Sequence, residues 1–133
     1  MALYQLIYIS ELAADESVLA AIHSHAVRNN TARTVTGMLL YANGRFLQIL
    51  EGERADVTHT FERIEEDPRH RRVRVVLQGA IEARLFSHWN MGFRHLSREQ
   101  LEQDNALKSY FERDYESAGR DRAEALAVLS QFA

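Results

Sequence analysis

The 133-residue chain is long enough for one domain with a hydrophobic core, and its 46% hydrophobic and 26% charged residues are ordinary for a globular protein. A net charge of −3 without a basic block makes nucleic acid an unexpected partner, and no apolar run approaches the roughly 20 residues of a membrane span. The absence of cysteine excludes disulfides, thiolate nucleophiles and cysteine-based metal sites, and the lack of an export signal favours the cytoplasm.

Strand and helix patterns alternate in the first third of the chain. Residues 3–9 are apolar on both faces, which predicts a buried strand. Asp15 is typical of the N-cap of a helix, and Asn29-Asn30-Thr31 should end that helix at about Arg28. The helix has a core-facing stripe at i, i+4 and i+8, formed by Val18, Ile22 and Ala26.

A predicted hairpin follows this helix. Residues 36–41 form its first strand, the Asn43-Gly44 pair its turn, and residues 44–52 its second strand. Both faces of this last strand are mostly apolar, so we expect it to be a central, buried strand of the sheet.

The rest of the chain continues with another helix, two strands and a helical end. The helix and the strands are predicted at residues 55–66, 73–77 and 89–93. Asp67-Pro68 ends the helix, because the residue before a proline disfavours the helical conformation. Ser97 and Gln100 resemble a capping box that begins the helical end, whose last helix spans about residues 120–131.

The order βαββαβ is that of a ferredoxin-like sandwich. We therefore predict an α+β fold with a fifth strand and two C-terminal helices. Residues 1–95 form one predicted domain, and residues 96–133 form a C-terminal helical extension. The extension either covers the second face of the sheet or makes an oligomer contact, and the sequence leaves both open.

A buried glutamine is the unusual feature of the central strand. Gln48 shares a face with the apolar Phe46 and Leu50, and a buried amide without partners costs roughly 1–3 kcal/mol. Gln48 is therefore either a core glutamine that backbone or water satisfies, or a residue that reads a polar ligand. Reversing its amide exchanges donor and acceptor, so Gln48 can hold two hydrogen-bonded states with little change in shape.

Tyr8 is the candidate partner of Gln48. The first and third strands of a ferredoxin-like sheet are adjacent, so the two residues can be cross-strand neighbours, although the sequence does not fix the register. Tyr8 is either an ordinary core tyrosine or a phenol that is hydrogen-bonded to Gln48. Its reference pKa near 10 keeps the phenol protonated at rest.

The two predicted helices supply the walls of a slot. Ile22 and Ile64, one on each helix, would form its apolar sides, and a flat ring would fit between them. Asn30 and Arg63 would reach the polar edge of that ring. Asn29 and Asn30 also suit a helix C-cap, where asparagine tolerates the left-handed conformation.

Other kinds of site find no support in the sequence. Arg63 and Asp67, four residues apart on a helix, suit an ordinary surface ion pair. His23 and His25 point in different directions, and the chain has no His-x-x-x-His pair, Gly-rich phosphate loop or Gly-Xaa-Ser-Xaa-Gly motif. We therefore predict neither a metal centre nor a hydrolytic one.

Taken together, these residues resemble the BLUF domain, the blue-light sensors that use flavin. The resemblance covers about residues 2–95. Five segments carry it in order: LIYIS with Tyr8, RNNTARTVTGMLLY with Asn30 and Gly37, GRFLQILEG with Gln48, RIEEDPRH with Arg63 and Asp67, and FSHWNMGF with Trp89 and Met91. Each segment is weak alone, but all five at this spacing are specific, so residues 1–95 resemble a flavin-binding photosensor domain.

The resemblance implies a flavin site. Asn30 would bind the carbonyl and N3 edge of the flavin, with Asn29 and Arg63 assisting, and Ile22 and Ile64 would flank the isoalloxazine ring. The full implied set of binding residues is Tyr8, Ile22, Asn29, Asn30, Gln48, Arg63, Ile64 and Asp67. Position 29 is asparagine here, where some members of the family carry histidine. FAD is the expected cofactor. FMN and riboflavin stay open as alternatives, because no Gly-rich loop would hold a phosphate tail, and His70, Arg71 and Arg72 would either meet a phosphate or be solvated.

The implied activity is photochemical and not enzymatic. Tyr8 would pass an electron and a proton to the excited flavin and recover both, while the Gln48 side chain rearranges by rotation or tautomerisation. A new or stronger hydrogen bond at the flavin C4 carbonyl would then shift the absorption to the red. Trp89 and Met91 occupy fifth-strand positions that the family links to signal output. The Gln48 amide, coupled to Trp89 or Met91, would be the bistable element.

No second catalytic domain is expected after residue 95. A stand-alone sensor would act on a separate protein effector or through a homo-oligomer, a dimer or larger. The apolar residues of the extension would serve either this contact or packing on the sheet: Tyr110, Phe111, Tyr115 and Leu126.

Two alternatives to a blue-light sensor are a ferredoxin-like binding module without photochemistry and an acylphosphatase-type hydrolase. The segment SELAADES lacks the glycines and arginine of the phosphate loop that such a hydrolase needs.

Overall fold

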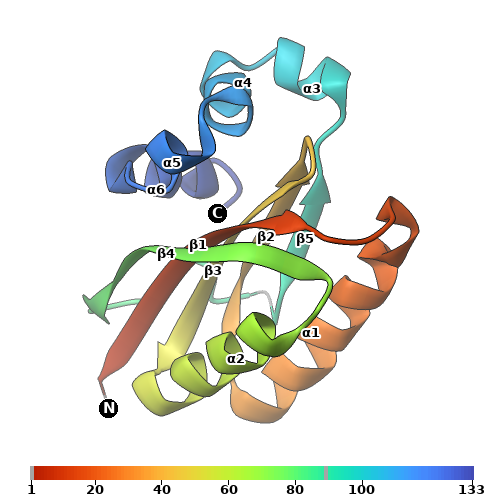
Figure 1. Ribbon diagram of the computed structural model, residues 1–133. Helices are drawn as coiled ribbons and strands as arrows, with labels where there is room; N and C mark the ends of the chain where they lie inside the picture. The colour runs from red at the N-terminus through yellow and green to blue at the C-terminus, as the bar shows by residue number, and fades with distance from the viewer. Residues whose placement is uncertain (1, 89) are drawn as a thin grey trace.

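A five-stranded sheet forms the middle of the protein (Figure 1), and the computed structural model describes residues 2–88 and 90–133, with the backbone alone at residues 30–33. Its strand order is β4-β1-β3-β2-β5. The strands are β1 (Leu3–Leu12), β2 (Thr36–Ala42), β3 (Arg45–Glu53), β4 (His70–Ile81) and β5 (Gly92–His95). The first four pair antiparallel, and β5 pairs parallel with β2. The prediction of a ferredoxin-like α+β fold with a fifth strand is confirmed.

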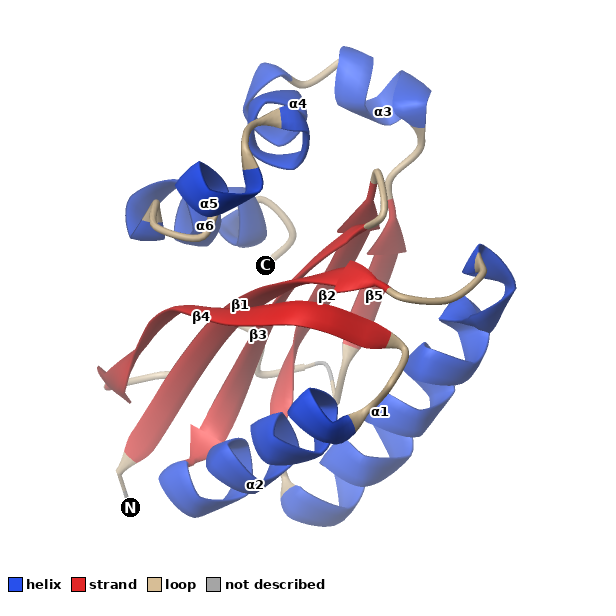
Figure 2. Ribbon diagram, viewed as in Figure 1, coloured by secondary structure: helices blue, strands red, loops and turns tan. Residues whose placement is uncertain are grey.

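Helices cover both faces of this sheet (Figure 2). On one face lie η1 (Glu16–Val18), α1 (Leu19–Arg33) and α2 (Arg54–Glu66). Over the other lie α3 (Arg98–Glu102), α4 (Asn105–Glu112), α5 (Tyr115–Ala118) and α6 (Arg122–Ser130). The two predicted C-terminal helices are therefore present as α4 and α6, accompanied by two helices of about one turn.

Alternate residues of each central strand supply two separate hydrophobic cores. Ile7 of β1 belongs to the core beneath α3–α6, whereas its neighbour Tyr8 belongs to the core beneath α1 and α2. Tyr110 and Phe111 of α4 are buried in the first core, as is Tyr115 of α5. These aromatic residues of the extension therefore pack on the sheet.

The turn between β2 and β3 has the conformation that the sequence predicts. Asn43 and Gly44 both have positive φ, 52° and 73°, which a two-residue hairpin turn of this type requires. The resulting register places Leu39 of β2 opposite Gln48 of β3. The turn thus sets which residues of β3 face α1 and α2.

The end of α1 differs from the prediction. The Asp15 side chain accepts a hydrogen bond from Ser17 N and caps η1, and the helix then continues through Arg33 instead of ending at Asn29-Asn30-Thr31. Thr34, with φ of 57°, takes the left-handed position. Arg84 Nη1 donates to the Thr34 carbonyl at 2.8 Å, so a contact from a distant loop stabilises this end.

The other element boundaries were misplaced for local reasons. β4 is longer than residues 73–77 because it is an edge strand, where exposed polar side chains are tolerated. β5 begins at Gly92, and the predicted residue Trp89 lies outside the described residues. The extension is divided by three aspartate N-caps, at Asp104, Asp114 and Asp121.

Candidate functional site

Tyr8 and Gln48 are directly opposite each other on neighbouring strands. The β1–β3 register pairs them, and the Tyr8 hydroxyl donates a hydrogen bond to Gln48 Oε1. Tyr8 is 1% exposed and Gln48 is 3% exposed. The buried amide predicted from the sequence therefore has a phenol partner from the adjacent strand.

The other end of the Gln48 amide contacts Met91. Gln48 Nε2 donates to Met91 Sδ at 3.1 Å. A thioether sulfur only accepts hydrogen bonds, whereas a phenol can donate or accept. This amide orientation is therefore the one in which both contacts are hydrogen bonds. The reversed orientation would place Oε1 against a sulfur that cannot donate.

Gly37 of β2 makes room for this arrangement. A Cβ atom at position 37 would lie 1.9 Å from the Ile49 carbonyl oxygen and 3.2 Å from Met91 Cε. Real Cβ contacts are never as short as the first of these distances, so only glycine lets β2 approach β3 here while the Met91 methyl packs above it. Gly37 thus contributes to the site because it has no side chain.

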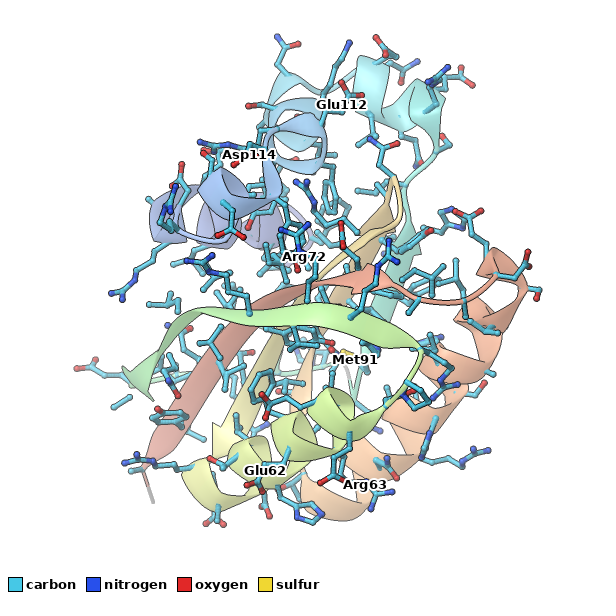
Figure 3. All side chains as sticks on the ribbon, in the orientation of Figure 1. Glu62, Arg63, Arg72, Met91, Glu112 and Asp114 are labelled. Atoms are coloured by element: carbon cyan, nitrogen blue, oxygen red, sulfur yellow. The ribbon has the colours of Figure 1, made fainter. Side chains whose placement is uncertain are left out.

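A cavity of about 850 Å³ opens between α1 and α2, above Tyr8 and Gln48. Its size lies in the range of about 300–1,000 Å³ that is typical of small-molecule sites. Seven of the predicted binding residues line it: Tyr8, Ile22, Asn29, Gln48, Arg63, Ile64 and Asp67. Figure 3 shows Arg63 on α2 toward α1, with Met91 nearer the strands. The side chain of Asn30 and the whole of Trp89 lie outside the described residues.

The cavity fits a flat ring with a polar edge. Ile22 and Ile64 line it from α1 and α2, as the sequence predicted for the apolar sides of a slot. His59, which also lines the cavity, has a buried Nε2 without a hydrogen-bond partner among the described residues. Buried polar atoms are nearly always hydrogen-bonded, so this nitrogen indicates that a polar group belongs in the cavity.

Charge at the cavity is arranged around Asp67. Its carboxylate pairs with Arg69, at 2.6 Å between Arg69 Nη2 and Asp67 Oδ2, so Arg69 takes the place of Arg63 in the ion pair that the spacing left open. Burial raises the pKa of Asp67, but the hydrogen bonds and charge of Arg69 lower it overall. Burial, followed by the charge of Asp67, raises the pKa of Tyr8 far above its ordinary value. Tyr8 is therefore a protonated donor toward Gln48.

The sequence left His70 open as a phosphate contact or a solvated residue, and did not predict that its ring is buried in the cavity wall. This histidine is 8% exposed, lines the cavity, and has Nδ1 at 2.9 Å from Ser10 Oγ. Its ring lies 4.7 Å from Phe46 and 6.3 Å from Tyr8, measured between centroids. His25, His59 and Arg69 were also missed as lining residues. No local pattern distinguishes them, because they meet only when the helices and strands pack together.

The described part of the chain offers neither a metal-binding cluster nor a membrane-spanning helix. Among the described side chains, no group of three or more histidine, aspartate or glutamate residues is placed to hold a metal ion. No described helix combines the length and apolar character that crossing a bilayer requires.

The family follows from a comparison with known proteins. A family profile described as "BLUF: Sensors of blue-light using FAD" matches residues 3–92, about two thirds of the chain. The chain belongs to the BLUF family. BLUF domains are flavin-binding blue-light sensor domains, and the Tyr8–Gln48 pair is present in this member.

Relatives of this BLUF protein include longer light-regulated proteins. It is 34% identical over 110 residues to the blue light- and temperature-regulated antirepressor BluF of Escherichia coli, covering 81% of this chain and 27% of BluF. It is 39% identical over 74 residues to the photoactivated adenylate cyclase subunit beta of Euglena gracilis, covering 55% of this chain and 9% of that protein. The chain therefore spans only a small part of these curated relatives.

A solved BLUF structure matches almost the whole chain. The dark-state structure of BlrB, a BLUF protein, superimposes with a TM-score of 0.77 at 25% identity, covering 99% of this chain and 98% of BlrB. A bacterial light-regulated adenylyl cyclase matches with a TM-score of 0.72 and 31% identity, covering 80% of this chain and 32% of that one. The BlrB match extends the likeness beyond the sensor core to the C-terminal helices.

Proposed function

We propose that this protein is a blue-light photoreceptor in which Tyr8 and Gln48 form a hydrogen-bond switch and Met91 carries the change to β5. One observation supports this most: the Tyr8 hydroxyl, the Gln48 amide and the Met91 sulfur form a continuous buried chain of hydrogen bonds. Tyr8 and Gln48 also line the cavity between α1 and α2. A switch there would act on a bound ring on one side and on β5 on the other.

The cofactor in this proposal is a flavin, FAD first, with FMN and riboflavin as alternatives. A flavin supplies blue-light absorption and an excited state that accepts electrons. Ile22 and Ile64 would hold the faces of its ring, and Asn29, Asn30 and Arg63 would bind its polar edge. Asp67 would stay in the surrounding network, where Arg69 keeps it ionised.

The chain itself would contribute two events to the switch. Tyr8 would transfer an electron and a proton, and the side-chain amide of Gln48 would reverse. Tyr8 is protonated and buried, so it gives up and recovers its proton together with an electron instead of titrating with solvent. Reversal of the Gln48 amide would turn Oε1 toward Met91 Sδ, which cannot donate. Met91 would then leave its position, and the change would reach β5 at Gly92.

The output in this proposal is regulation of a separate effector or of a homo-oligomer, without catalysis by this chain. Residues 1–95 would be the photosensor domain and residues 96–133 its helical extension, in a cytoplasmic protein. Relatives named as an antirepressor and as light-regulated cyclases support a signalling output. The cyclase relatives are much longer than this chain.

Absorption spectroscopy of the reconstituted protein tests the proposal. The purified protein should bind added flavin, show a red-shifted spectrum under blue light, and recover in darkness. Tyr8→Phe and Gln48→Leu should each abolish the red shift while flavin stays bound, because each removes one partner of the switch. A protein that takes up no flavin, or a normal photocycle in either variant, would refute the proposal.

The chain contains its own control for these two substitutions. Tyr4 and Gln78 form a second tyrosine–glutamine hydrogen bond of 3.0 Å on the exposed part of the same sheet, outside the cavity lining. Tyr4→Phe and Gln78→Leu make the same chemical changes there. Both should keep the full red shift.

A further inference from the structure

Met91 is held by its backbone as well as by its side chain. His23 of α1 has Nε2 at 2.8 Å from the Met91 carbonyl oxygen. The same imidazole stacks on Phe93, with 5.2 Å between ring centroids and an interplanar angle of 25°. One side chain of α1 therefore contacts the residues on both sides of Gly92, the residue at which β5 begins.

The chemistry of this contact fixes the form of the imidazole. A carbonyl oxygen only accepts hydrogen bonds, so Nε2 of His23 must carry the proton that is shared with Met91. His23 is half-buried and does not line the cavity, although its neighbours Ile22 and His25 do. It therefore faces β5, away from the proposed flavin.

The side-chain contact of Met91 alone is a weak anchor. A thioether sulfur is a weak acceptor, and a methionine side chain has three flexible torsions. The preceding loop is held at Leu85 and Phe86, whose backbone N–H groups both donate to the Glu51 carboxylate at 2.8 Å. The contact to His23, in contrast, holds the backbone of Met91 itself.

We propose that His23 is a positioning residue of the switch, whose imidazole holds the Met91 backbone so that the sulfur stays within reach of the Gln48 amide. This inference rests on the proposed function of Tyr8, Gln48 and Met91. Recovery in darkness must re-form the contact between Gln48 and Met91, so a Met91 that is less well placed slows that recovery. The Tyr8–Gln48 pair itself is untouched.

Pairwise isotope labelling observes the hydrogen bond directly. Gly92 is the one glycine that follows a methionine in this sequence, so carbonyl-¹³C methionine with ¹⁵N glycine yields a single NMR correlation, that of Met91 and Gly92. In the dark, His23→Phe should move the Met91 carbonyl signal upfield, because the ring remains but the donor is lost. His23→Gln, which keeps a donor, should leave the signal near its wild-type position.

Kinetics then test whether the contact serves the switch. His23→Phe should keep the red shift but slow dark recovery by about 2- to 10-fold, the effect expected from one hydrogen bond. His23→Gln should restore recovery to nearly the wild-type rate. His95→Phe is the matched control, because His95 is an exposed residue of the same strand that touches Tyr41 by ring contact, and it should leave both measurements unchanged.

Each failure points to a different step. The role of His23 is overturned if the Met91 carbonyl signal does not move in His23→Phe. It is also overturned if the signal moves but dark recovery is no slower than in His95→Phe. A wild-type protein without a red shift refutes the proposed function, while the dark carbonyl signal still reports on the His23 contact. If His23→Phe does not fold, the ¹⁵N shifts of the wild-type imidazole decide, since a proton on Nδ1 instead of Nε2 overturns the proposal.

Discussion

His70 lies behind Tyr8 as a buried and neutral imidazole. It packs against Phe46 and Tyr8 and is hydrogen-bonded to Ser10. Burial lowers its pKa to about 4, against an ordinary value of 6.5, even though the charge of Asp67 acts in the opposite direction. Between these two pH values the unfolded chain binds a proton at this position that the folded chain does not.

The folded protein should therefore lose stability in mild acid. The contribution of His70 is complete above pH 6.5 and falls by up to about 3 kcal/mol as the pH decreases toward 4, because the unfolded state takes up the proton first. Urea unfolding between pH 7.5 and 4.5 measures this slope. His70→Gln should flatten it, whereas His88→Gln, at an exposed histidine, should not. Equal slopes in all three proteins would contradict the prediction.

At the scale of the elements, β3 does more than present Gln48. Three residues further along the strand, the Glu51 side chain is 0% exposed and accepts one backbone N–H on each carboxylate oxygen, from Leu85 and Phe86. Arg84 donates to the Glu51 carbonyl at 3.0 Å and to the Thr36 hydroxyl at 2.9 Å. β3 thus holds the loop that leads from β4 to Met91.

Glu51→Gln should weaken this loop. A glutamine can still accept one of the two N–H groups, but its own NH₂ then faces the other, and a buried unpaired donor costs about 1–3 kcal/mol. We expect the free energy of unfolding in urea at pH 7 to fall by that amount. The control is Glu53→Gln at the half-exposed end of β3, which makes the same change with little effect. A Glu51→Gln protein as stable as this control would show that the loop is held otherwise.

The same elements show what the sequence could and could not predict. The order of the first elements, and the face that Gln48 shares with Phe46 and Leu50, followed from apolar periodicity and from the Asn43-Gly44 turn, which are local signals. The end of α1 did not, because Thr34 is stabilised by Arg84, fifty residues away in sequence. Likewise, the i, i+4 spacing of Arg63 and Asp67 left an ion pair open that Arg69, two residues from Asp67, makes instead.

At the scale of the whole molecule, the C-terminal extension completes a hydrophobic core that the sheet begins. Ile7, Ile9 and Leu47 of the central strands belong to one cluster with Tyr110 of α4 and Leu129 of α6. The last helix turns Ala125, Val128 and Leu129 inward, while Ala123 and Ala127 are exposed. The extension and the sheet therefore depend on each other for stability.

A single truncation in α6 should test this dependence. Leu129 is 0% exposed, and Leu129→Ala should lower the free energy of unfolding by about 2–5 kcal/mol, the cost of a leucine-to-alanine cavity. Leu85→Ala, at a leucine that is 39% exposed, should cost far less. Thermal or urea denaturation compares the two. A small effect at Leu129, with the sheet still melting at the wild-type midpoint, would mean that the extension is dispensable.

In the proposed switch, the narrow link through Met91 would limit how strongly light can act on an effector. Exchanging one or two hydrogen bonds there would change the free-energy difference between two output conformations by about 1–3 kcal/mol, a factor of about 5–150 in their ratio. Driving an effector from 1:99 to 99:1 takes about 5.5 kcal/mol. The proposed effector would therefore need two conformations of nearly equal free energy in the dark, or contact with several sensor copies whose small effects add. The energy of the photon is not limiting, so the size of the response would depend on the conformational equilibrium of the effector.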